Sequence, residues 1–294
     1  MLMDVNELIR RVRRIELKTR RQTREVFAGS YHSAFKGRGM SFSEVRRYAF
    51  GDDVRAIDWN VTARTGEPHI KVFEEERELS LLLIADISAS MRTGAEAKSD
   101  WLAELCATLA FSAEANHDKT GLLLFDDKPG WYLPPRKSRN QTLRIVRELL
   151  HGAALSNARN TGLAEALQYA HRVLRQRSVC VIVSDFISDD FTPALRALSR
   201  RHDCIGIHLW DRLERELPDV GLARVRDAER GRDLWIDTTE PETRREWTRQ
   251  FDARMTTLHR IFAGAKADWA SVETGKDFVP TLLGLFDRRR QRFS

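Results

Sequence analysis

Oxygen-bearing side chains follow two apolar stretches of this sequence. The segment LLLIADISASMRTG, residues 81–94, runs from nearly continuous apolar residues into Asp86 and then places Ser88 and Ser90 two residues apart. A second apolar stretch, SVCVIVSDF, leads into Asp185. Carboxylate and hydroxyl oxygens are the hard ligands that Mg²⁺ prefers in an octahedral shell that often keeps several waters. These residues therefore predict a site for a divalent cation.

The two apolar stretches are typical of strands that are buried on both faces of a parallel sheet. Helical and strand patterns alternate after them, which predicts an α/β fold with a doubly wound, mostly parallel sheet flanked by helices. Ligands of such sheets bind outside the carboxyl ends of the strands, so we expect Asp86 and Asp185 at the same edge. Thr161, which opens a helix between them, would add a third hydroxyl there. Taken alone, Thr161 or Asn160 is better explained as a helix N-cap than as a metal ligand.

The hydroxyl groups in this set are neutral. A cation held mainly by hydroxyls keeps more of its positive charge than one held by several carboxylates. It can therefore attract an acidic group from another molecule. Both Mg²⁺ and Mn²⁺ accept oxygen ligands, so the sequence leaves the identity of the metal open.

The order of these residues resembles a known metal site. DISAS, a later Thr and a strand ending in SD resemble the D-x-S-x-S…T…D metal-ion-dependent adhesion site of von Willebrand factor A domains. The resemblance implies that Ser88, Ser90 and Thr161 ligate the ion directly. It also implies that Asp86 and Asp185 act largely through water or hydrogen bonds.

A longer block before this motif carries a second resemblance. GRGMSFSEVRRYAFGDDVRAIDWNVTARTGEPHIKVFEEE resembles the stretch that precedes the von Willebrand factor A-like domain in the bacterial domain-of-unknown-function 58 family. Members of that family are typically encoded beside MoxR-type AAA+ ATPases. The resemblance therefore implies a protein partner, such an ATPase or its client, that supplies an acidic residue to the metal edge.

The chain divides by composition into an N-terminal arm, residues 1–78, and a von Willebrand factor A-like domain, residues 79–294. Apolar residues at helical spacing predict a basic amphipathic helix from residue 4 to about 27. Residues 29–67 are rich in Gly, Arg and Asp and predict an ordered but irregular segment fastened by charge pairs. The sequence leaves open whether that segment is a separate small domain or a belt around the core, and we favour the belt.

Charge and cysteine usage exclude several classes of protein. Lys and Arg number 49 against 43 Asp and Glu, and the excess lies at the two ends of the chain rather than across its body. Nucleic acid is therefore disfavoured as a partner, because a binder would carry a basic stripe across the body. Three widely spaced cysteines, Cys106, Cys180 and Cys204, predict buried thiols in a reducing compartment. No apolar run approaches the length of a membrane span, so we expect a cytoplasmic protein.

Three functions are compatible with these residues. The first, which we favour, is a non-catalytic, metal-dependent adaptor. The second is a Mg²⁺-dependent phosphohydrolase that uses Asp86, although such enzymes resemble D-x-D-x-[TV] and position 88 is Ser, which lacks the carboxyl group of a general acid. The third is a tether that binds anionic lipid or nucleic acid through the basic N-terminal helix.

Overall fold

The computed structural model describes residues 10, 12–16, 31, 34, 40–75, 79–92, 97–155, 161–226 and 233–293. The chain divides into two compact units. One is formed by residues 36–79, and the other by residues 1–35 together with residues 80–294.

The larger unit is built on a six-stranded sheet with the strand order β10-β7-β6-β3-β4-β5. All neighbouring strands in it pair in parallel except β5, which is antiparallel to β4. The strands are β3 (Ser80–Asp86), β4 (Lys119–Phe125), β5 (Pro129–Arg136), β6 (Val179–Ser184), β7 (Asp203–Trp210) and β10 (Asp268–Glu273).

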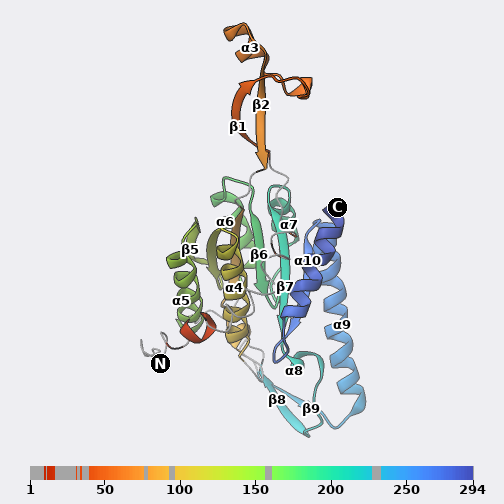
Figure 1. The fold of residues 1–294 in the computed structure, drawn as a ribbon. Helices are drawn as coiled ribbons and strands as arrows, with labels where there is room; N and C mark the ends of the chain where they lie inside the picture. Colours follow the sequence, from red (N-terminus) through yellow and green to blue (C-terminus); the bar gives the residue numbers. More distant parts are fainter. Residues whose placement is uncertain are drawn as a thin grey trace. The chain divides into compact units, whose positions relative to one another are not determined.

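Helices flank this sheet (Figure 1). The longer ones are α4 (Lys98–Ala115), α5 (Arg139–Leu155), α6 (Leu163–Val173), α7 (Thr192–Ser199), α9 (Pro241–Gly264) and α10 (Val279–Phe293). Side chains of α6, α7 and α9 share one core cluster with alternate residues of the strands. The helices α4 and α5 pack against each other and on the central strands. The predicted α/β class, a doubly wound and mostly parallel sheet, is confirmed.

Strand alternation decides which side chains meet on each face. In β3, Leu82 and Ile84 belong to the cluster formed with α6, α7 and α9, and in β6 Cys180 and Ile182 do so. Every described residue of β6, and every residue of β3 after the first, is buried, as predicted for strands covered on both faces. Because side chains alternate with a period of two, Asp86 at the end of β3 continues the same face.

The smaller unit contains regular structure, and its elements up to residue 65 lie where we predicted an irregular segment. It consists of β1 (Met40–Arg47), η2 (Val54–Ala56), α3 (Trp59–Thr65) and β2 (His69–Glu75), and β1 pairs with β2 in an antiparallel hairpin. The prediction failed because few apolar positions in this segment repeat at a strand or helix period. Side-chain caps supply the local order instead.

Charge pairs and caps hold this smaller unit together, as expected. The Arg46 guanidinium donates to both carboxylate oxygens of Asp52, at 2.8 and 2.7 Å. Asp53 caps η2 through the Arg55 N–H, and Asp58 caps α3 and also pairs with Lys71. These aspartates therefore stabilise local structure, which agrees with a fastening role rather than a catalytic one.

Other predicted elements fall partly within the described residues. The strands β8 (Leu222–Arg226) and β9 (Asp233–Asp237) form an antiparallel hairpin, whose turn lies outside the described residues. Of the predicted N-terminal helix, residues 10 and 12–16 are helical and the rest lies outside the described residues. All three cysteines are buried free thiols, as predicted. In the described part of the chain, no helix combines the length and apolarity needed to cross a membrane.

A buried histidine makes stability depend on pH. Burial lowers the pKa of His208 from 6.5 to about 3, with a further lowering by Arg254, a smaller opposing effect of Asp185 and a lowering by Lys98. The unfolded chain therefore binds a proton at pH 5 that the folded protein does not. His208 should therefore lower the free energy of unfolding as the pH drops below about 6.5, by roughly 2 kcal/mol at pH 5.

Urea unfolding of the wild type and His208→Phe between pH 7 and pH 5 measures this effect. The phenylalanine retains a ring beside Trp269, on which His208 stacks with ring centroids 5.6 Å apart. The variant should lose less stability on acidification than the wild type. Equal losses in the two proteins would contradict the assignment.

Candidate metal-binding edge

The Asp86 side chain is fully buried at the carboxyl end of β3. Its Oδ1 accepts a hydrogen bond from the Ser88 backbone N–H at 2.8 Å, and its Oδ2 accepts one from the Ser184 hydroxyl at 2.5 Å. The second contact follows from the sheet register, because β3 and β6 pair in parallel with Ala85 opposite Val183. Asp86 and Ser184 are therefore neighbours on the same face.

The two predicted serines lie directly after Asp86. Ser88 is fully buried, and Ser90 is only 4% exposed and lies in the short 3-10 helix η3 (Ala89–Arg92). Their hydroxyl oxygens are 3.1 Å apart. The D-x-S-x-S segment thus gathers its carboxylate and both hydroxyls in one buried group of oxygens.

Asp185 follows β6 at the same edge of the sheet and is also fully buried. Its Oδ1 accepts a hydrogen bond from the Ile187 N–H at 3.2 Å, and its Oδ2 accepts one from the Lys98 ammonium at 2.8 Å. A hydrogen bond to the Ser90 side chain links this carboxylate to the serine segment. The structure therefore brings Asp86, Ser88, Ser90 and Asp185 together, as the sequence predicts.

Thr161 lies beside the loop that follows β4, the strand next to β3. It precedes α6 by two residues, and the N-cap of that helix is Gly162, so Thr161 is not the N-cap. The Gly162 N–H donates to the Asp126 carbonyl oxygen at 2.6 Å, and a Cβ on Gly162 would lie 2.2 Å from the Asp127 carbonyl oxygen. Only glycine permits this approach, which fixes the Thr161 segment at the carboxyl edge.

The two carboxylates of the edge differ in their electrostatic surroundings. Burial, and then repulsion from Asp185, raise the pKa of Asp86 to about 7. Burial also acts to raise the pKa of Asp185, but the Lys98 charge and hydrogen bond outweigh it and the pKa is lowered. Asp185 thus has a cationic partner, whereas Asp86 accepts hydrogen bonds from the neutral Ser88 N–H and Ser184 hydroxyl.

Sequence reasoning missed Lys98 and its second partner, Glu214. Lys98 begins α4, is 1% exposed, and donates to Glu214 Oε1 at 2.9 Å as well as to Asp185. Glu214 lies in the short helix α8 (Arg212–Arg215) and also pairs with Arg254 of α9 at 3.2 Å. Burial lowers the pKa of Lys98, but attraction to Asp185 and Glu214 outweighs it, so the ammonium stays charged.

The residues present fit a hard divalent cation. Hydroxyl and carboxylate oxygens gather at a buried edge, where the buried Asp86 carboxylate accepts hydrogen bonds from the uncharged Ser88 N–H and Ser184 hydroxyl. A buried carboxylate without a countercharge is costly, and a cation relieves that cost. Among the described residues, no group of three or more His, Cys, Asp or Glu side chains is placed to hold a metal ion, so hydroxyl oxygens would have to contribute.

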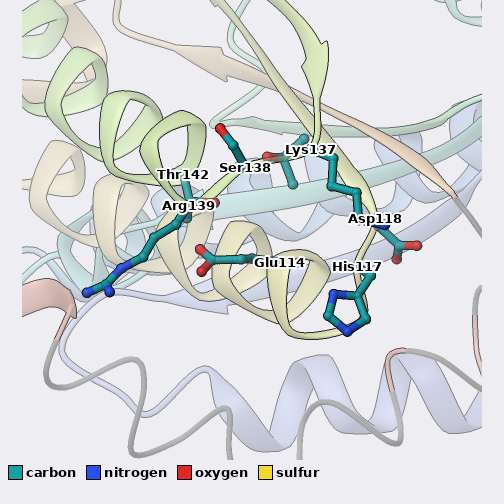
Figure 2. Close-up of a pocket in the computed structure, with 8 residues that line it drawn as sticks. Glu114, His117, Asp118, Lys137, Ser138, Arg139 and Thr142 are labelled. Atoms are coloured by element: carbon teal, nitrogen blue, oxygen red, sulfur yellow. The ribbon is translucent and has the colours of Figure 1, made fainter.

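A small cavity of about 130 Å³ lies elsewhere in the larger unit. Figure 2 shows its lining, which comes from the end of α4, the start of β4 and the start of α5. The residues around it are Glu114, His117, Asp118, Thr120, Lys137, Ser138, Arg139 and Thr142. Because it lies at the amino end of β4, it is not part of the metal-binding edge.

Comparison with known proteins gives a family match over most of the chain. The family model described as "Protein of unknown function DUF58" matches residues 44–257. Uncharacterized proteins of Mycobacterium tuberculosis and Mycobacterium bovis are each 30% identical over 294 residues, covering 98% of this chain and 92% of their own length. An uncharacterized protein of Mycobacterium avium is 25% identical over 162 residues, covering 54% of this chain and 94% of its own.

Comparison with solved structures gives more distant matches. BatB from Bacteroides thetaiotaomicron, a conserved hypothetical protein, is 14% identical with a TM-score of 0.48, covering 72% of this chain and 99% of its own. The VWA domain of SpRpn10 is 10% identical with a TM-score of 0.40, covering 72% of this chain and 95% of its own.

Proposed function

The chain belongs to the DUF58 family, and from that premise we propose that it is a non-catalytic interaction protein whose binding edge requires Mg²⁺ or Mn²⁺. The observation that supports the proposal is the buried oxygen cluster at the carboxyl ends of β3 and β6. Asp86, Ser88, Ser90 and Asp185 meet there, and the Thr161 segment is fixed at the same edge.

Each residue has a distinct role in this proposal. The hydroxyls of Ser88, Ser90 and Thr161 would hold the ion directly, while Asp86 and Asp185 would act through hydrogen bonds or water. The Ser88 N–H and the Ser184 hydroxyl fix the orientation of the Asp86 carboxylate. When bound, the ion supplies a positive charge with an open ligand position for a carboxylate of the partner.

The partner we propose is a MoxR-type AAA+ ATPase or a protein that such an ATPase remodels. This part of the proposal rests on the family resemblance of the block before the metal motif. Recognition through the edge requires only one exposed Asp or Glu on the partner, because a carboxylate completes the coordination shell of a hard cation.

A Mg²⁺-dependent phosphohydrolase is not favoured. In the enzymes that use a nucleophilic Asp at the end of a strand, a second Asp two residues later acts as general acid, and here that position is Ser88. Ser88 instead lies beside Ser90 with their hydroxyl oxygens 3.1 Å apart. Lys98, the buried cation nearest in sequence to this motif, is engaged by Asp185 and Glu214.

The proposal predicts metal-dependent capture of a partner. Immobilised wild type incubated with host extract and Mg²⁺ should retain a protein that is lost on adding a chelator. Asp86→Ala should fail to retain it in both conditions, because the substitution removes the carboxylate that orients the site. Circular dichroism and a thermal melt would show that this variant remains folded.

Asp189→Asn is the matched control. Asp189 is an exposed acid in the loop that follows Asp185, and it is not among the proposed ligand residues. This variant should retain the partner as the wild type does. Equal retention by the wild type and Asp86→Ala, with and without metal, would place the interface elsewhere and overturn the proposal.

A further inference from the structure

Lys98 occupies a position that a helix alone would not favour. It is the first residue of α4, where the positive end of the helix dipole opposes a cation. Its side chain is 2% exposed and reaches Asp185 and Glu214 from separate parts of the chain. The ammonium is therefore held by the acids of the metal-binding edge rather than by its own helix.

These ion pairs form one connected network that extends from the metal-binding edge to α9. Asp185 pairs with Lys98, Lys98 with Glu214, and Glu214 with Arg254. With Asp86 ionised, as a bound cation favours, these groups comprise three carboxylates and two cations, with a net charge of −1. A divalent cation at the edge would bring this net charge to +1.

We propose that Lys98 sets the ligand specificity of the edge by neutralising Asp185, so that the metal-loaded site keeps a net positive charge and selects a carboxylate. Without Lys98, the remaining groups and a divalent cation sum to zero, and the electrostatic preference for an acid is lost. This inference rests on the proposed function, because it concerns the same metal site.

The charge count predicts opposite effects on the two ligands. Removing Lys98 deletes a positive charge beside Asp185, so Mg²⁺ alone should bind more tightly. The same change makes the loaded site less positive, so a carboxylate should bind more weakly. A variant that had merely lost structure would bind both ligands more weakly, which separates a specificity role from a structural one.

The experiment measures Mg²⁺ binding by calorimetric titration. Each protein is titrated in sodium chloride and, at the same ionic strength, in sodium acetate. For Lys98→Met we expect Mg²⁺ affinity to rise about tenfold or more, because the substitution removes the repulsion between the Lys98 ammonium and the cation, which is strong at the dielectric constant of a protein interior. The strengthening of Mg²⁺ binding by acetate, which we expect in the wild type, should shrink or disappear. The full chain is used throughout.

Glu214→Gln provides the reciprocal variant should Lys98→Met fold poorly. It removes a negative charge while Lys98 and Asp185 remain, so Mg²⁺ should bind more weakly and acetate should strengthen binding more than in the wild type. Lys119→Met, which removes a lysine at the amino end of β4, is the charge-matched control and should change neither quantity.

Two negative outcomes are distinguishable. If the folded wild type binds no Mg²⁺, the proposed metal-dependent function fails. The wild type could instead bind Mg²⁺ more tightly in acetate while Lys98→Met and Glu214→Gln show the same Mg²⁺ affinity as the wild type, or affinities that change in the same direction in both variants. In that case the metal site stands and the role of Lys98 is refuted.

Discussion

Replacing Lys98 by methionine is expected to lower the free energy of unfolding of the metal-free protein by roughly 3–5 kcal/mol, the usual cost of removing one partner of a buried ion pair. Lys98 and Asp185 have side-chain exposures of 2% and 0%, so solvent cannot replace the lost partner. The loss arises mainly because a buried carboxylate is left without its countercharge. Urea unfolding at neutral pH in the presence of a chelator measures it.

A second substitution identifies the cause. Asp185→Asn introduced together with Lys98→Met removes the carboxylate charge that has lost its partner. The double variant should therefore recover a substantial part of the lost free energy of unfolding. Lys119→Met again serves as the control, with a change expected within about 0.5 kcal/mol for a substitution away from such a buried pair. A double variant no more stable than Lys98→Met would contradict the charge explanation.

Replacing Arg289 by methionine should be similarly costly, roughly 3–5 kcal/mol. Arg289 is 1% exposed, and its guanidinium pairs with Asp203 at the start of β7 and with Asp268 at the start of β10. These pairs fasten α10 to the amino ends of two neighbouring strands. The substitution leaves two carboxylates without their shared cation.

The neighbouring Arg290 gives a matched control for this prediction. Its side chain is 54% exposed and pairs with the exposed Asp287 on the same helix. Arg290→Met should change the unfolding free energy by no more than about 0.5 kcal/mol, as is typical of exposed helical pairs. Similar losses for the two arginines, measured by the same urea titration, would show that burial does not set the cost.

The positions of most candidate ligand residues could be predicted from the sequence because they follow local rules. The buried strands appear as apolar runs, and parallel pairing brings their carboxyl ends to one edge, so Asp86 and Asp185 could be placed together. Ser88 and Ser90 follow Asp86 directly, and chain connectivity holds them there. For Thr161 the sequence predicted the correct edge but placed the start of the helix at this residue instead of Leu163.

Contacts between distant residues could not be predicted in this way. Lys98 reaches Asp185 across 87 residues and Glu214 across 116, and no local pattern marks a lysine at the start of a helix as buried. Ser184 directly precedes Asp185 in the sequence. Its hydrogen bond to Asp86 could not be predicted without the pairing register of β3 and β6. The hairpin of β1 and β2 was missed because caps and charge pairs, rather than a repeating apolar pattern, stabilise it.

Binding of Mg²⁺ by the purified protein tests the central claim most directly. Calorimetric titration should give saturable binding at one site in the wild type and in Asp189→Asn. It should give no binding in Asp86→Ala that is shown to be folded by its thermal melt. Failure of the folded wild type to bind Mg²⁺ or Mn²⁺, or equal binding by Asp86→Ala, would contradict a metal-dependent interaction edge.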